Sequence, residues 1–502
     1  MAASRRSRAA LISTLVVVPV VLAAQSAAPP LSADVLLQRA DGFVRDGRFT
    51  DAADAYRTIL GGLVADGVRE RARAGLTLSL LRKGDFAGAR AEGARLAATP
   101  GASARSLSLY GDSLWSAGLF DEAERAYDTS LSLDPDDPRA HHGRARSLTA
   151  RGRFDEALAE ARSAIASAPD EAEFHYMLGV IYERQRRFPD AAAAFGEYIA
   201  RLPDHDKSPT ALWTRAEIRF LHAFDRLTPV EFAGHAAAST SWTVPIRIDK
   251  GKVLVRAKVN GDAVDFVLDT GAELTALSLD AAARRGVTPV AYTESAGVGD
   301  HGRRGLQVGR IPRLQVGDLD VRNVPCLIKN PALGALPTQE PDSFSPLALG
   351  LSMTIDYARR ELLMSRALPP SAHAMELPLR VYRLATVRGL VNGTPVSFVV
   401  DTGGQWISIS RATAAALPGP PPARHIPLRV YGTSGWDKDA FLMPNVDLAF
   451  DALHLASTPV VVLNLSAPSE LLGFQVGGIV GHSFLSKYRV TFDLQRSILA
   501  LD

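Results

Sequence analysis

The stretch Val259-Asn-Gly-Asp-Ala-Val-Asp-Phe-Val-Leu-Asp269-Thr-Gly-Ala272 returns later in the chain as Val391-Asn-Gly-Thr-Pro-Val-Ser-Phe-Val-Val-Asp401-Thr-Gly-Gly404. Between 259–278 and 391–410 half of the positions are identical, at a constant offset of 132, the difference between 401 and 269. Such self-similarity indicates an internal duplication, and the offset has the size of one small domain. The same local structure is therefore predicted twice.

Each copy predicts an acidic residue on a loop between two buried strands. An Asn-Gly turn opens the copy, alternating apolar residues follow, and Asp-Thr-Gly then leads into a second apolar run that ends in Ser. Asn-Gly favours a tight hairpin, and alternation with period two favours a strand. The duplication thus supplies two carboxylates, one from each copy.

Length and composition place these copies within a larger protein. The chain has 502 residues and a mass of 53.7 kDa, which is too long for one ordinary core, so we expect two or three domains. About 47% of the residues are apolar and 22% are charged, as in ordinary globular proteins. The formal net charge of +2 gives no electrostatic reason for a nucleic-acid partner.

The first residues have the form of an export signal. Arg5, Arg6 and Arg8 precede an uncharged, mostly apolar run over 9–24. That run of about 16 residues is shorter than the roughly 20 that a spanning helix needs. We therefore expect a cleaved signal peptide over 1–28, a periplasmic or extracellular location, and membrane association only if the signal is retained.

A repeat dominates residues 31–225. Five copies of a Gly-x-Phe-x-x-Ala pattern follow one another at steps of 37, 34, 34 and 34, and they begin at Gly47, Gly84, Gly118, Gly152 and, with Arg in place of Gly, Arg186. The Gly ends one helix, the Phe fills the angle between helices, and the Ala lets the next helix approach closely.

This pattern resembles the tetratricopeptide repeat, and the resemblance implies an α-solenoid over 31–225. Such arrays present a concave surface, so a peptide or a protein partner on the repeat array is expected. The alternative is a spacer that only displays the other half of the chain. Residues 226–242 lose the helical period and gather Pro229, Gly234 and hydroxyl side chains, which predicts a linker.

The remaining sequence predicts two β lobes, at 243–367 and 373–502, on either side of Leu368-Pro-Pro. A glycine-rich hairpin candidate follows each Asp-Thr-Gly, at 297–302 and 430–435. Each lobe also contains a similar strand near its end, at 353–357 and 490–494.

With these features the last 260 residues or so resemble the aspartic peptidases of the retropepsin-like and pepsin-like group. The resemblance implies a multidomain chain whose α-solenoid is followed by an all-β bilobal domain. It also implies that Asp269 and Asp401 hold the lytic water between them. The residues that it assigns to supporting the two catalytic loops are Thr270, Gly271, Thr402 and Gly403. The threonine hydroxyls would brace one loop against the other, and the glycines would let the backbone come close and offer amides to the carboxylates.

The hairpins correspond to the flaps of that family. Candidate flap or substrate contacts are Gly299, Tyr431, Gly432 and Trp436, although the two aromatic side chains would equally well fill their own hairpin. The segment 478–485 matches the glycine-containing stretch that packs beneath the catalytic loop in the family. In the first lobe the corresponding stretch, 343–349, carries Ser345 where glycine is expected.

Two carboxylates that share one proton provide both the base and the acid that peptide hydrolysis by water requires, as in the well-known aspartic peptidase dyad. We therefore expect an endopeptidase with one active site per chain, an acidic to near-neutral optimum, a peptide or protein substrate, no cofactor and no metal. Ser345, together with Gly404 where Ala or Ser is usual, keeps an alternative open, namely a non-catalytic peptide-binding or scaffold protein. The only cysteine, Cys326, lies in an apolar run and is expected to be a buried thiol.

Overall fold

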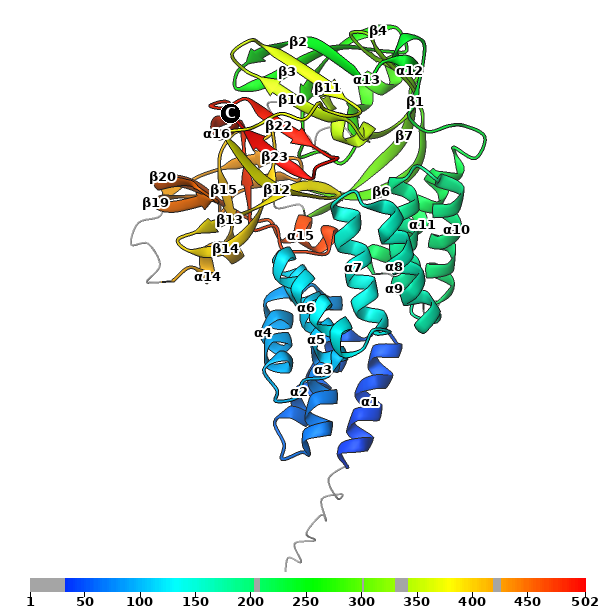
Figure 1. Ribbon diagram of the computed structural model, residues 1–502, viewed down its shortest axis with the longest axis vertical. Helices are drawn as coiled ribbons and strands as arrows, with labels where there is room; N and C mark the ends of the chain where they lie inside the picture. Colours follow the sequence, from blue (N-terminus) through cyan, green and yellow to red (C-terminus); the bar gives the residue numbers. More distant parts are fainter. Residues whose placement is uncertain (1–31, 203–207, 300–301, 330–341, 419–425) are drawn as a thin grey trace, which may run out of the picture.

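The computed structural model describes residues 32–202, 208–299, 302–329, 342–418 and 426–502, and it shows a helical repeat array beside a β domain (Figure 1). The predicted signal peptide over 1–28 lies outside the described residues. Among the residues described, no helix combines the length and the apolar character that crossing a membrane requires.

The repeat array consists of antiparallel helix pairs and one further helix. The helices are α1 Ala33–Arg45, α2 Phe49–Leu60, α3 Asp66–Lys83, α4 Phe86–Ala97, α5 Ala104–Ser116, α6 Phe120–Leu133, α7 Pro138–Ala150, α8 Phe154–Ser167, α9 Ala172–Arg184, α10 Phe188–Ala200 and α11 Pro209–His222. The Phe of each sequence repeat is the first residue of the second helix in its pair. The α-solenoid predicted from the repeat is thus present.

The turn inside each pair needs a left-handed residue. Four of the five turns use glycine, with φ between 70° and 76° at Gly47, Gly84, Gly118 and Gly152. Arg186 takes the same conformation, with φ at 61°, although this costs a residue with a Cβ about 1–2 kcal/mol. Its guanidinium donates a hydrogen bond to the carbonyl of Leu349 in the β domain. The fifth turn therefore keeps its geometry and is tied to the neighbouring domain.

The segment predicted as a linker, 226–242, is folded against the β domain. It contains strand β1 Glu231–Phe232, which pairs with β8 Leu319–Lys329, and the short helix α12 His235–Ala238. Strand β2 begins at Ser241, within this segment. Local composition did not reveal these elements because a two-residue strand leaves no periodic pattern.

Both lobes follow one plan. Lobe 1 comprises β2 Ser241–Asp249, β3 Lys252–Val259, β4 Asp262–Leu268, β5 Thr275–Ser278, α13 Leu279–Arg284, β6 Pro289–Ala296, β7 Arg303–Val316, β8 Leu319–Lys329, β9 Ser343–Phe344, η1 Pro346–Leu349, β10 Ser352–Asp356 and β11 Glu361–Ser365. Lobe 2 comprises β12 Met375–Tyr382, β13 Leu384–Val391, β14 Thr394–Val400, β15 Ser408–Ser410, α14 Arg411–Ala416, β16 Ile426–Pro427, β17 Val430–Gly432, β18 Gly435–Asp437, β19 Phe441–Phe450, β20 Leu453–Leu463, α15 Ser466–Leu472, β21 Gly478–Val480, α16 His482–Leu485, β22 Val490–Asp493 and β23 Ile498–Leu501.

Strand register relates the lobes residue by residue. In lobe 1, β4 pairs in parallel with β9, and Val267 lies opposite Ser343; in lobe 2, β14 pairs in parallel with β21, and Val399 lies opposite Ile479. Because Val399 corresponds to Val267 at the offset of 132, Ser345 takes the place of Gly481. The serine is accommodated at this position and is 1% exposed.

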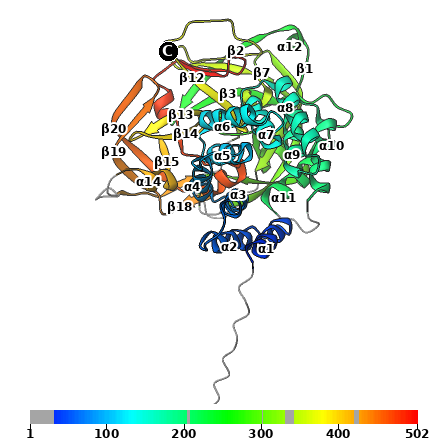
Figure 2. The same ribbon diagram turned by 60° about the horizontal axis from the view of Figure 1, so that its bottom comes forward.

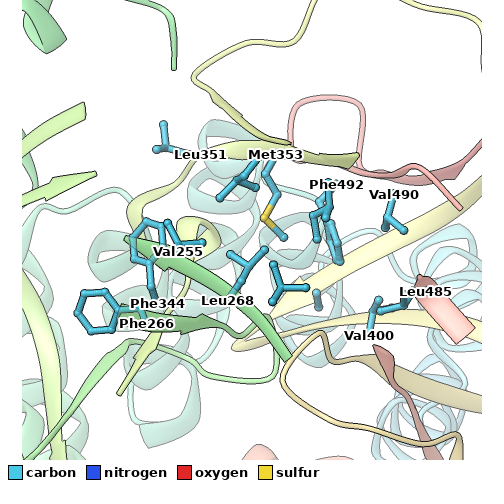
Figure 3. Close-up of a cluster of buried hydrophobic side chains, with 14 of the residues drawn as sticks. Val255, Phe266, Leu268, Phe344, Leu351, Met353, Val400, Leu485, Val490 and Phe492 are labelled. Atoms are coloured by element: carbon cyan, nitrogen blue, oxygen red, sulfur yellow. The ribbon is translucent and has the colours of Figure 1, made fainter. Parts of the chain in front are cut away.

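An antiparallel sheet joins the lobes in the order β2-β11-β10-β22-β23-β12. At its centre β10 pairs with β22, and the hydroxyls of Thr354 and Thr491 lie 2.9 Å apart. Figure 3 shows the apolar cluster beside this sheet, to which both lobes contribute, with Leu268 and Met353 from lobe 1 and Val400 and Phe492 from lobe 2. The two lobes therefore share one core.

The array packs against both lobes (Figure 2). Its middle contacts lobe 2, where Trp115 and Phe120 share a buried cluster with Phe474. Its last helices contact the strands of lobe 1, where Phe188 and Phe224 share a cluster with Val308 on β7 and with Ala291 on β6. The array is therefore fixed to both lobes by buried apolar side chains.

Candidate active site

The two Asp-Thr-Gly loops begin where β4 and β14 end. The backbone N–H of Asp269 donates to the carbonyl of Phe344 at 2.9 Å, and that of Asp401 donates to the carbonyl of Val480 at 3.0 Å. Each loop is thus held by the strand that pairs in parallel with the strand before it. Equivalent supports place the two aspartates in equivalent positions.

The threonines that follow the aspartates bind one loop to the other. Thr270 donates its hydroxyl hydrogen to the carbonyl of Val400 at 2.6 Å, and Thr402 donates to the carbonyl of Leu268 at 2.8 Å. In return each hydroxyl accepts the backbone N–H of the other threonine at 3.1 Å. Both side chains are buried. The loops therefore meet at an approximate twofold axis, braced as the sequence predicts.

The glycines allow the carboxylates to face each other. Gly271 and Gly403 donate their N–H groups to the carboxylates of Asp269 and Asp401, at 3.0 and 2.8 Å. A Cβ on Gly271 would lie 2.5 Å from Cγ of Asp401, and one on Gly403 would lie 2.7 Å from Cγ of Asp269. A side chain at either position would overlap the opposite carboxylate. A Cβ on Gly404 would likewise lie 2.7 Å from an oxygen of Asp401.

The two carboxyl groups lie in one site, since a Cβ on the glycine of either loop would overlap the carboxylate of the other. Burial, followed by the negative charge of Asp401, raises the pKa of Asp269 to about 7. The positive charges of Lys329 and Lys252 oppose this rise in the pKa. The arrangement therefore retains one proton on the pair up to neutral pH.

Basic residues outside the motif donate hydrogen bonds to each of the two loops. Lys252, at the tip of the β2–β3 hairpin, donates to the carbonyl of Gly403 in the other lobe. Arg383, at the tip of the β12–β13 hairpin, donates to both carboxylate oxygens of Glu273 at 2.5 and 2.9 Å. Neither Lys252 nor Arg383 was predicted from the sequence. The one signal was the acidic Glu273 just after Asp-Thr-Gly, in a loop that otherwise holds apolar residues.

The two hairpins predicted as flaps touch at their tips. The N–H of Gly297, after β6, donates to the hydroxyl of Ser434 at 3.0 Å, and the N–H of Ser434 donates to the carbonyl of Val298 at 2.9 Å. Ser434 lies between β17 and β18. The flaps of the two lobes therefore close on each other, and residues 300–301 of the first tip lie outside the described residues.

A cavity of about 560 Å³ opens beside the dyad. The loop residues Asp269, Thr270 and Gly271 line one part of it, and the flap residues 293–296, Thr433 and Ser434 line another. The rest of its lining includes residues of the repeat array from α7 to α11. A substrate in this cavity would therefore contact the array as well as the β domain.

The four flap residues proposed from the sequence do not line this cavity. Gly299 lies at the junction, against Ser434, and Gly432 lies against Val298. The rings of Tyr431 and Trp436 pack on each other with centroids 5.3 Å apart. Contact of these four residues with substrate stays a prediction. In the second hairpin, the residues that line the cavity are Thr433 and Ser434.

Cys326 is inaccessible to any reactant. It lies in β8, is 0% exposed, and burial raises the pKa of its thiol to about 12. A thiol that stays protonated and inaccessible is a packing residue. Among the described residues no group of three or more His, Cys, Asp and Glu side chains has the arrangement of a metal site.

Comparison with protein families agrees with this architecture. The model of the aspartyl protease family matches the chain twice, over 255–352 and 387–484. The tetratricopeptide repeat model matches over 37–103, 109–169 and 142–206. The chain thus contains a tetratricopeptide solenoid followed by two aspartyl protease-like lobes, and the fold class and both resemblances predicted from the sequence are confirmed.

Among solved structures, the tetratricopeptide protein TTC0263 of Thermus thermophilus is 18% identical with a TM-score of 0.33, over 38% of this chain and 100% of that one. YrrB, described as a tetratricopeptide protein with an unusual peptide-binding site, is 20% identical with a TM-score of 0.22, over 35% and 88%. Pseudomonas aeruginosa pilF is 15% identical with a TM-score of 0.28, over 41% and 87%. No curated protein matches the chain.

Proposed function

We propose that this chain, in which a tetratricopeptide solenoid precedes two aspartyl protease-like lobes, is an exported aspartic endopeptidase that hydrolyses peptide bonds with a water held between Asp269 and Asp401. The observation that carries the proposal is the placement of both carboxyl groups in one site, where Gly271 and Gly403 each donate a backbone N–H to the aspartate of their own loop and lie against the carboxylate of the other. The basic residues and apolar run within 5–24 support export.

The mechanism follows from one proton shared by two carboxyls. The ionised carboxyl takes a proton from the water, whose oxygen attacks the peptide carbonyl carbon, while the protonated carboxyl donates to the carbonyl oxygen. The tetrahedral intermediate then breaks its C–N bond as the amine nitrogen receives a proton from the pair. Because the two groups titrate together, neither aspartate has a fixed role as acid or base.

The braced loops contribute by holding the carboxyls in place. Thr270 and Thr402 fix the separation of the loops, so the water position is formed before substrate binds. The flap tips contact each other, and flap residues line part of the cavity. The repeat array recruits the substrate or a partner protein to this site.

Peptide cleavage by single-residue variants tests the proposal. Denatured casein is incubated with the wild-type protein, Asp269→Asn and Asp401→Asn between pH 3 and 8, with and without a statine-type inhibitor. Each substitution is expected to lower kcat/KM by about 10³-fold or more, because removing either member of a catalytic unit disables both. Activity that survives in either variant would contradict a shared dyad.

The second candidate function is peptide binding without hydrolysis. It is favoured by Ser345, which stands in lobe 1 at the position that Gly481 has in lobe 2. The same assay separates the two candidates. Absence of cleavage throughout the pH range, together with retained binding of the inhibitor, would favour binding over catalysis.

A further inference from the structure

The array side of the cavity carries an acidic side chain that forms no ion pair with any described residue. Glu217 on α11 is 6% exposed and lines the cavity. Within the described ranges, no hydrogen bond or ion pair holds its carboxyl group. The groups that act on it through charge are Glu183 on α9, Glu273 of the lobe 1 loop, and Arg383. A carboxyl group that is buried in this way, but open to a cavity, lacks the hydrogen-bond or ionic partner that buried carboxyl groups usually have.

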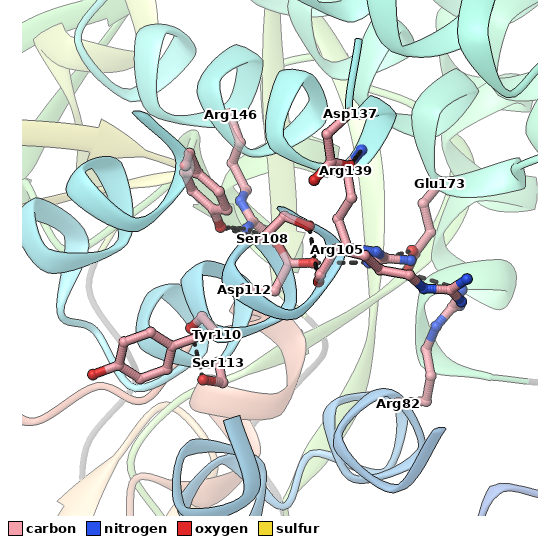
Figure 4. Close-up of polar contacts among 11 residues, drawn as sticks. Arg82, Arg105, Ser108, Tyr110, Asp112, Ser113, Asp137, Arg139, Arg146 and Glu173 are labelled. Atoms are coloured by element: carbon pink, nitrogen blue, oxygen red, sulfur yellow. Dashed lines mark hydrogen bonds and ion pairs between the residues drawn. The ribbon is translucent and has the colours of Figure 1, made fainter. Parts of the chain in front are cut away.

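Another buried carboxylate of the array, Asp112, has several hydrogen-bond partners (Figure 4). Asp112 receives hydrogen bonds from Arg139 and Arg146, both at 2.8 Å, and from the hydroxyl of Tyr127 at 2.9 Å. Asp112 is therefore fully paired by side chains of the array itself. Glu217 departs from this pattern at the place where the array faces the cavity.

The neighbouring cations are already engaged. Arg383 donates to both oxygens of Glu273 and to the carbonyl of Leu471, and its guanidinium lies 5.0 Å from the centre of the Trp213 ring. The guanidinium of Arg184 lies 6.0 Å from the centre of the Phe154 ring. Neither guanidinium group donates a hydrogen bond to Glu217, so this carboxyl group is left open to a positively charged group of a substrate.

The walls around Glu217 suit a long cationic side chain. Tyr176 and Trp213 line the same cavity and lie 6.2 Å apart in an edge-to-face arrangement. Aromatic surfaces accept the methylene stem of a basic side chain, and the carboxylates accept its charged head. Asp269 lines the same cavity, so such a side chain would belong to a peptide that also reaches the dyad.

We infer that Glu217 and Glu183, on the last helices of the array, form a specificity subsite for a positively charged group of the peptide substrate, either a Lys or Arg side chain or a free amino terminus. This inference rests on the proposed function, because the occupant is a substrate of the same active site. The solenoid is then part of the active site, and it selects which peptides are cut.

The raised pKa values of Glu217 and Glu183 give cation binding at this subsite a measurable signature. Burial, followed by the charges of Glu183 and Glu273, raises the pKa of Glu217 well above its usual range, and burial with Glu273 raises the pKa of Glu183 to about 7. An incoming cation stabilises the ionised carboxylates, so binding near neutral pH releases protons. The charged and titratable groups around the subsite are Glu183, Glu273, Arg184, Arg383, Tyr176 and Tyr382.

Cleavage of matched peptides tests the inference. A series of short peptides, acetylated and amidated, carries Lys or Gln at one position that is moved along the sequence, and a parallel set keeps a free amino terminus. The wild-type protein is expected to cut the best Lys or free-amine peptide at least about tenfold faster in kcat/KM than its neutral counterpart. Glu217→Gln and Glu183→Gln should abolish this preference, so that each variant cuts the charged and the neutral peptide at rates within about twofold of each other.

Glu197→Gln is the matched control, because Glu197 is exposed on the neighbouring helix α10 and pairs with Arg201. It should keep the full preference. Equal cleavage of charged and neutral peptides by the wild type, or a preference that survives in Glu217→Gln, would overturn the inference while leaving the peptidase proposal intact.

A measurement of peptide binding distinguishes failure of this inference from failure of the proposed function. Calorimetry with the full-length Asp401→Asn protein, in two buffers of different ionisation heat, measures affinity and proton release for the Lys and Gln peptides. Tighter binding of the Lys peptide with proton release, both lost in Glu217→Gln, supports the subsite even if no peptide is ever cut. No difference in affinity between the Lys and Gln peptides overturns it.

Discussion

Two carboxyl groups, Asp269 and Asp401, lie too close together and too deep for both to carry a charge at acidic pH. Burial and the charge of Asp401 raise the pKa of Asp269 to about 7, so the pair holds a proton that an exposed aspartate would have lost near pH 4. That shared proton is the chemical basis of the proposed hydrolysis.

The pH dependence of kcat/KM follows from this raised pKa. As pH rises through about 7, Asp269 loses the shared proton and no acid remains to protonate the substrate carbonyl. We expect kcat/KM to fall about tenfold per pH unit above this value. Steady-state rates on a single peptide between pH 4 and 9 measure the fall, and rates that keep rising to pH 9 would contradict a shared proton.

The threonine brace predicts a difference between two similar substitutions. Thr402→Val removes a hydroxyl that is 0% exposed and leaves the carbonyl of Leu268 and the N–H of Thr270 without partners. This should lower the free energy of unfolding by about 2–4 kcal/mol and reduce activity. Thr402→Ser keeps the hydroxyl and should lose less than about 1 kcal/mol. Chemical denaturation of both variants provides the comparison, and equal losses would show that the methyl group matters more than the hydrogen bonds.

The residues of the repeated motif were predictable because the motif appears twice, and their roles were implied by the resemblance to the aspartic peptidases. Asp269 and Asp401, their threonines and their glycines meet as the duplication suggests. Lys252, Arg383 and Glu217 were not predictable. They reach the site from hairpins and from a helix that are distant in sequence, and no local pattern marks them.

At the scale of elements, the two flaps act as one unit because their tips exchange backbone contacts. A Cβ on Gly432 would lie 2.5 Å from the carbonyl oxygen of Val298. Gly432→Ala should therefore separate the tips. We expect exchange of the Ser434 amide, which donates to that carbonyl, to accelerate at least about tenfold, and KM to rise.

Gly305→Ala is the matched control for the flap, since a Cβ at Gly305 on β7 meets no heavy atom within 4 Å. It should leave both amide exchange and KM unchanged. If Gly432→Ala behaved like this control, the contact between the flaps would have no part in substrate binding.

Helices with a long sequence period were predicted well, as were short strands that occur in both lobes, such as β10 and β22, whereas the isolated short elements β1 and α12 were not. The repeat phenylalanines marked the helix starts, and glycine marked the turns, because each turn needs a left-handed residue. Arg186 keeps that conformation through its contact with Leu349, which the repeat pattern alone does not reveal. The elements β1 and α12 in the expected linker depend on pairing and packing against lobe 1.

At the scale of the whole molecule, the array and the β domain share buried clusters, so we expect them to unfold together. Trp115 is 1% exposed and packs on Phe120 of the array and on Tyr382 of lobe 2. Trp115→Ala should lower the free energy of unfolding by about 3–5 kcal/mol for both parts. Helical circular dichroism and exchange of the Thr402 amide report on the two parts, and both should shift to the same extent.

Leu76→Ala supplies the control, because Leu76 is 2% exposed in a cluster formed by the first repeats alone. It should loosen those repeats and leave the Thr402 amide protected. Unfolding of the helices in Trp115→Ala with the β domain intact would mean that the array is only attached to, and not part of, the folded unit.

The stoichiometry of a statine-type inhibitor tests most directly that one chain builds one dyad from its own two lobes. Titration of the wild-type protein should saturate at one inhibitor per 53.7-kDa chain, with affinity that weakens above pH 7 and is lost in both Asp269→Asn and Asp401→Asn. One inhibitor for every two chains, or binding that persists in either variant, would contradict it.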